Sequence, residues 1–181
     1  SEVERLLEEI KELAKRVKDI IKEVNKENKR LVDEVKDRIR KINEDNNRLV
    51  ETVKELIRKG VPKEEIADIV RRVVKTAEDS NRKILRIAEE VVRTARESDE
   101  RVREIVRRVV EEVRELLKRL PPGKELERIE REVERLADEL RKLLEESNES
   151  TERLAEELER LVRESERDSR RLAEELKRRL D

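Results

Sequence analysis

The side chains best placed to do chemistry are uncharged polar residues that interrupt the apolar faces of three long helical segments at an 18-residue step. They form two sets: a first polar layer of Asn25, Asn28, Thr94, Ser98, Ser147 and Thr151, and a second polar layer of Asn43, Asn46, Thr76, Ser80, Ser165 and Ser169. Amides and hydroxyls both donate and accept hydrogen bonds. They could therefore bond to one another inside a core, or hold a small molecule or ion.

The residue types that are missing argue against catalysis. The 181 residues include no Cys, His, Met, Trp, Tyr or Phe, so the chain has no thiolate nucleophile, no imidazole base and no soft-metal ligand. No carboxylate is expected within the apolar faces beside the polar layers, and no glycine-rich turn lies near them to hold a phosphate. We therefore predict no enzymatic activity, no metal site and no cofactor.

The composition predicts long helices, since 54% of the residues are charged and only two Gly and three Pro occur. Gly60 suits the left-handed position after a helix, and Pro62 suits a first turn. Pro121 removes a backbone donor and disfavours helix in the residue before it. These stop signals predict helices at about 2–59, 63–119 and 124–180, with loops near 60–62 and 120–123.

Short connections place consecutive helices side by side and antiparallel. We expect an all-α fold, an elongated antiparallel up-down-up three-helix bundle that forms a single domain over residues 1–181. Segments such as Leu136–Leu140, Leu154–Leu158 and Leu172–Leu176 recur every 18 residues. Eighteen residues are about five turns at 3.6 residues per turn, so the apolar stripe stays on one side of a nearly straight helix.

Reflecting the chain about its two loops sets the three contributions to each polar layer at the same level. The neighbouring polar residues Asn47, Asn81, Asn148 and Ser150 are expected to extend the layers toward the surface. A buried polar group without a partner costs about 1 to 3 kcal/mol. We interpret the layers as structural: they fix register, because a slip of one turn would set polar groups against Leu and Val.

The surface charge gives no sign of a nucleic-acid or membrane partner. Lys and Arg number 48 against 49 Asp and Glu, and no aromatic side chain is present on which a base could stack. Apolar residues come singly or in pairs, far short of the roughly 20 needed to cross a bilayer, and no signal-peptide pattern opens the chain. We expect a soluble protein, and expression in a host cytoplasm fits.

Taken together, these residues resemble computationally designed helical bundles with buried hydrogen-bond networks, a class that includes designed heterodimers and cage-and-latch switches. The resemblance rests on the Gly60-Val61-Pro62 and Pro121-Pro122-Gly123 loops, the surface rich in Glu, Lys and Arg, and the polar layers. It implies a hyperstable structural scaffold without catalytic activity. A natural spectrin-like or apolipoprotein-like bundle is the alternative origin.

The alternative function is protein interaction, either as three helices of a four-helix heterodimer or switch, or as a self-associating bundle. The second helical segment has the widest apolar stripe, and one flank of it carries Val74, Leu85, Val92 and Val110. If the core leaves this flank exposed, it is a candidate site for a partner helix or a second copy. Neighbouring helices and Arg or Lys stems could instead cover it.

Overall fold

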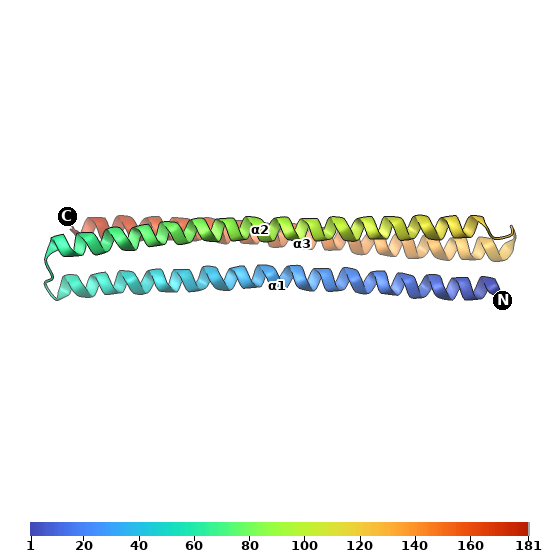
Figure 1. Cartoon of the computed structure of the whole chain (residues 1–181), viewed down its shortest axis with the longest axis horizontal. Coiled ribbons are helices and arrows are strands. Elements are labelled where there is room, and N and C mark those ends of the chain that lie inside the picture. The colour runs from blue at the N-terminus through green and yellow to red at the C-terminus, as the bar shows by residue number, and fades with distance from the viewer. Residues whose placement is uncertain (181) are drawn as a thin grey trace. The chain divides into compact units, whose positions relative to one another are not determined.

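The protein is entirely helical over the residues that its computed structural model describes, 1–180. The helices are α1 (Glu2–Arg58), α2 (Lys63–Lys118) and α3 (Lys124–Leu180), joined by two short turns (Figure 1). The helix boundaries predicted from the sequence are confirmed to within one residue. An apolar stripe at helical spacing on each segment explains why no strand competes within the described range.

The turn between α1 and α2 has the hydrogen bonds of a Schellman motif. Gly60 has a φ of 78°. Its N–H donates to the carbonyl of Ile57 at 3.2 Å, and the N–H of Val61 donates to Leu56 at 3.2 Å. Val61 also packs against the apolar cluster at this end. The carbonyl of Pro62 then accepts the first bonds of α2, from Glu65 and Ile66. Local residue types therefore determine this turn, as the sequence predicted.

The turn between α2 and α3 is made differently, because the chain cannot continue as a helix through Pro121. The N–H groups of Arg119 and Leu120 bond three residues back, to Leu116 and Leu117, and tighten the last turn. Gly123 has no positive φ. Its carbonyl accepts from Glu127 at 3.1 Å and starts α3.

The described chain divides into two compact units, and each helix contributes to both. Unit 1 consists of Ser1–Lys29 and Arg93–Arg153, and unit 2 consists of Arg30–Val92 and of α3 from Leu154 onward. Each unit therefore contains a segment of every helix and one of the two turns. The expectation of a single domain stays a prediction.

Unit 1 has two apolar clusters. One lies at the end with the α2–α3 turn and includes Ile10, Val113, Leu117, Ile129 and Val133. The other contains Val17, Ile21, Val102, Val106 and Leu140. Between these clusters the residue numbers rise in α1 and α3 and fall in α2. Within this unit α1 and α3 are therefore parallel and α2 is antiparallel to both.

Unit 2 follows the same pattern. One cluster is built around Val35, Ile39, Ile84, Ala88 and Leu158. The other, beside the α1–α2 turn, is built around Val50, Val53, Ile66, Val70 and Leu176. Numbers again rise in α1 and α3 and fall in α2. The up-down-up order is thus visible within each unit.

Ion pairs between α1 and α3 recur at the 18-residue step. Lys18 contacts Glu139 at 2.6 Å in unit 1, and Lys36 contacts Glu157 at 2.7 Å in unit 2. The lysine partner is the largest cause of a lowered pKa in each of these glutamates. All four side chains are partly exposed, so each pair stabilises by at most about 1 kcal/mol.

Candidate functional site

The first polar layer lies in unit 1 and is centred on a carboxylate. Asp99 on α2 is only 8% exposed. Its Oδ1 lies 3.4 Å from Nδ2 of Asn28 on α1 and 3.4 Å from Oγ of Ser147 on α3. The Thr151 hydroxyl donates a further hydrogen bond to the carboxylate. Asp99 therefore accepts hydrogen bonds from both neighbouring helices.

Ser147 continues this network toward the edge of the core. Its Oγ lies 2.6 Å from Oδ1 of Asn25, a half-buried residue of α1. A hydroxyl carries one proton, so Ser147 donates to Asn25 or to Asp99 at any moment, and Asn25 is the closer acceptor. The network thus joins five side chains from three helices within unit 1.

Burial raises the pKa of the Asp99 carboxyl above its usual value, because the charged form loses water. The hydroxyls of Thr151 and Ser147 and the positive charge of Arg103 oppose this change, and the negative charge of Glu152 adds to it. Glu152 is itself bound by two hydrogen bonds of 3.0 Å from Arg96. No cation forms an ion pair with Asp99 within the described chain, so hydrogen bonds alone compensate its burial.

The second polar layer lies in unit 2 and is centred on an amide. Ser165 on α3 is 2% exposed. Its Oγ lies 3.0 Å from Oδ1 of Asn43 on α1 and 3.2 Å from Oδ1 of Asn81 on α2. Asn81 is 8% exposed and stands 18 residues before Asp99. Ser165 and Ser147 therefore have equivalent roles in the two units.

Two members of the second layer lack a protein partner. The Ser169 hydroxyl is buried without a hydrogen bond, and no hydrogen bond links the buried Asn46 to any other residue of the described part. Their counterparts 18 residues away, Thr151 and Asn28, both bond to Asp99. A carboxylate offers acceptors on two oxygens, whereas an amide has one oxygen and one donor nitrogen. Exchanging Asp for Asn thus removes the acceptor these two donors need.

The sequence prediction was wrong about which residues α2 contributes. Thr94 and Thr76 are exposed, and Ser98 and Ser80 are only half-buried, with no hydrogen bond printed for either hydroxyl. The expectation that no carboxylate lies within the apolar faces was also wrong, because Asp99 is buried. Asn81 does not extend the layer toward the surface but occupies its centre. The predicted residues on α1 and α3 are buried or half-buried.

A spacing signal could have identified Asp99 and Asn81. Asp99 follows the buried Ala95 by four residues and precedes the buried Val102 by three, which places it on the inward stripe. Asn81 has the same relation to Ala77 and Ile84. Residues 94 and 98 fall at the edge of that stripe, where rotation of the helix decides exposure.

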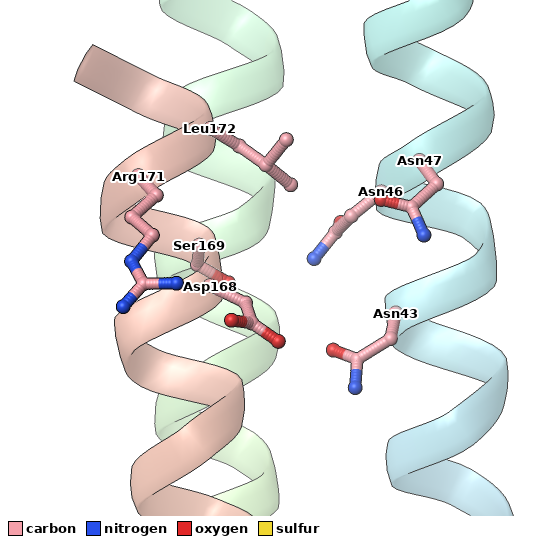
Figure 2. A pocket seen from close by; sticks show the side chains of 7 residues that line it. All are labelled: Asn43, Asn46, Asn47, Asp168, Ser169, Arg171 and Leu172. Atoms are coloured by element: carbon pink, nitrogen blue, oxygen red, sulfur yellow. The ribbon is translucent and has the colours of Figure 1, made fainter. Parts of the chain in front are cut away.

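An open crevice borders the second layer between α1 and α3. It has a volume of about 210 Å³ and is lined by Asn43, Asn46, Asn47, Asp168, Ser169, Arg171 and Leu172. Figure 2 shows Asn46 and Asn43 extending from α1 toward Asp168 and Ser169 on α3. Both polar residues that lack a protein partner thus line one space.

The predicted partner flank is largely covered. Val92 belongs to the core of unit 2 and is 9% exposed. Val74 and Val110 are partly buried against apolar clusters of their own units. Of the four flank residues only Leu85 is exposed. The 18-residue spacing therefore tracks the edge of the core and not an open strip.

Other kinds of site receive no support from the described residues. Residues 1–180 contain no group of three His, Cys, Asp or Glu side chains suited to a metal ion. In the same range, no helix combines the length and the apolarity needed to cross a membrane. The polar layers and the crevice are therefore the features on which a function can be argued.

Comparisons with known proteins match the resemblance drawn from the sequence. The chain is similar to a solved structure described as "Computationally designed three helix bundle", with 19% identity and a TM-score of 0.42. The match covers 99% of this chain and 86% of the other. No family model matches, and no curated protein matches. The function must be argued from this chain's own residues.

Proposed function

We propose that the chain is a non-catalytic structural scaffold, a designed three-helix bundle in which the two polar layers set the register of the helices. The observation that carries the proposal is the position of Ser147 and Ser165. Each is a buried serine of α3 whose hydroxyl lies within hydrogen-bonding distance of one oxygen on α1 and one on α2. One side chain therefore connects all three helices at one level in each unit.

Apolar packing alone specifies register weakly in this chain. The inward faces carry mainly Val, Ile, Leu and Ala at helical spacing, so a slip of α1 by one turn would still bury aliphatic groups. The same slip would move Asn28 against Val32's surroundings and remove its acceptor, at a cost of about 1 to 3 kcal/mol per unpaired group. The polar layers would thus distinguish registers that the apolar residues leave close in energy.

The test compares the natural chain with a variant whose polar layers are apolar. The substitutions are Asn25, Asn28, Asn43, Asn46, Asn81 and Asp99 to Leu, Ser147, Ser165 and Ser169 to Ala, and Thr151 to Val. Register is read by thiol crosslinking, for which the absence of Cys is convenient. A cysteine at Lys36 is paired with one at Glu157, its natural neighbour, or with one at Arg153, a turn away.

We expect the natural layers to give crosslinking at position 157 and little at 153. The apolar variant should stay helical and at least as stable, because well-packed apolar residues often replace buried polar groups without loss. It should nevertheless crosslink at both positions. Crosslinking confined to position 157 in that variant would show that the polar layers do not set the register.

A second candidate function is self-association through α2. Ile105 and Leu116 are 42% and 43% exposed in unit 1, and they lie 11 residues apart, about three turns along one side of α2. Light scattering over a wide concentration range tests it. A self-associating chain exceeds 21.7 kDa as concentration rises, and Ile105→Glu with Leu116→Glu returns it to that mass. A constant mass of one chain eliminates this candidate.

A further inference from the structure

The crevice between α1 and α3 of unit 2 has the features of a small binding site. Ser169 is 7% exposed and its hydroxyl has no partner. Asn46, 6% exposed, faces the same space from α1 (Figure 2). Buried polar groups are almost always hydrogen-bonded, to protein or to something else. The unmet groups of both residues therefore point to an occupant of the crevice.

The wall of the crevice restricts the charge of that occupant. Asp168 contributes a carboxylate and Arg171 a guanidinium, so the lining carries one charge of each sign. An anion would be opposed by Asp168 and a cation by Arg171. A neutral molecule meets neither penalty. It can also use Asp168 as an acceptor and Ser169 as a donor.

The volume and the apolar part of the wall restrict size and shape. About 210 Å³ corresponds to about seven water molecules at roughly 30 Å³ each. A molecule of a few heavy atoms therefore fits together with some water. Leu172 supplies an apolar surface beside the polar groups. A carboxamide with a short alkyl group matches this arrangement: an N–H₂ donor, a carbonyl acceptor and an apolar end.

We propose that this crevice binds a small neutral carboxamide, whose carbonyl accepts from Ser169 and Asn46 and whose N–H₂ group donates to Asp168. The site exists only in unit 2, because Asp99 occupies the donors of the equivalent residues in unit 1. The probe is acetamide, whose methyl group packs against Leu172. Acetate is the matched control, since it has nearly the same shape but a negative charge.

The experiment follows the side-chain amide signals of the asparagines by NMR while acetamide is added to the full chain. We expect the signals of Asn46 and Asn43 to shift and saturate, with half-saturation on the order of 10 mM, as suits a ligand of four heavy atoms. The signals of Asn28 and Asn25 should stay in place, because unit 1 offers no unmet donors. Acetate should give no saturable shift.

Two variants make the result specific. Ser169→Ala removes one donor and should weaken binding about threefold to tenfold. Asn81→Asp gives Asn46 and Ser169 the acceptor that Asp99 gives their counterparts, so it should also weaken binding without touching the crevice wall. Circular dichroism verifies that both variants are folded, and a variant that is not is replaced by Asp168→Asn, which lies on the exposed surface.

Three outcomes would overturn the proposal. A shift that rises linearly without saturation means that solvent alone fills the crevice. Equal shifts in the two units mean that acetamide contacts asparagines without a site. Unchanged affinity in folded Ser169→Ala and Asn81→Asp means that the occupant does not use the unmet groups.

Discussion

Asp99 in unit 1 and Asn81 in unit 2 stand at equivalent positions of the 18-residue repeat, yet they organise their surroundings differently. Asp99 accepts from Asn28, Ser147 and Thr151. Asn81 is hydrogen-bonded only to Ser165, and leaves the groups equivalent to Asn28 and Thr151 without a protein partner. Replacing one oxygen by an N–H₂ group separates a connected layer from an incomplete one. In a repetitive fold, the number of acceptors at a single buried position can decide whether a network closes.

The largest expected difference between the units is the cost of removing each central residue. Asp99→Ala leaves Asn28 and Thr151 unpaired, so we expect it to lower the free energy of unfolding by about 3 kcal/mol. Asn81→Ala removes one bond, while Ser165 keeps Asn43, so we expect a loss of about 1 kcal/mol. Guanidinium unfolding of both variants measures this difference. Equal losses would mean that the extra hydrogen bonds to Asp99 contribute nothing net.

Removing one hydroxyl from each layer should give effects of different sign. Thr151→Val keeps the shape of the side chain but removes a donor to Asp99, and should cost about 1 kcal/mol. Ser169→Ala removes a buried hydroxyl that has no protein partner, and should leave stability unchanged or raise it by up to about 1 kcal/mol. Thermal unfolding compares the two. A clear loss in Ser169→Ala would show that the hydroxyl has a partner, such as the proposed occupant of the crevice or bound water.

The two layers should also differ in their response to pH. The pKa of Asp99 is raised in the folded protein, so the folded state binds a proton more readily than the unfolded state. Its contribution to stability is therefore weakest at neutral pH. It improves as pH falls through the folded pKa toward the usual value of 3.8 and is then constant. The second layer has no titrating group at its centre.

Asp99→Asn isolates this effect from the surface glutamates, several of which have lowered pKa values and respond in the opposite direction. The stability of the natural chain minus that of Asp99→Asn should rise on acidification. Denaturant midpoints at several pH values give this difference. A difference that is flat, or that falls as pH is lowered, would contradict the raised pKa.

The smallest expected effect is one that the two units share. The pairs Lys18–Glu139 and Lys36–Glu157 are equivalent in the repeat and similar in distance. A double-mutant cycle to Gln or Met at each pair should give about 0.2 to 1 kcal/mol, equal in both units and reduced by salt. Unequal coupling energies would mean that the units differ in more than their central polar residue.

Helix ends and inward faces were predictable because short-range chemistry determines them. Gly60 takes a positive φ that other residues resist, and Pro121 cannot continue the hydrogen-bond ladder of α2. Asn28, Asn46, Ser147 and Ser165 lie centrally in their apolar stripes, so their burial followed from spacing. On α2 the stripe is wide, and spacing did not separate Ser98 from its neighbour Asp99.

By itself, the sequence determined three helices, where each begins and ends, and two polar levels separated by five turns, because dihedral preferences and helical periodicity act over a few residues. Only the tertiary structure decided that Asp99 and Asn81, and not Thr94 and Thr76, face the core. That choice depends on how far α2 rotates about its own axis when it packs against α1 and α3. A rotation of one residue is 100°, and the energy of packing three helices together sets it.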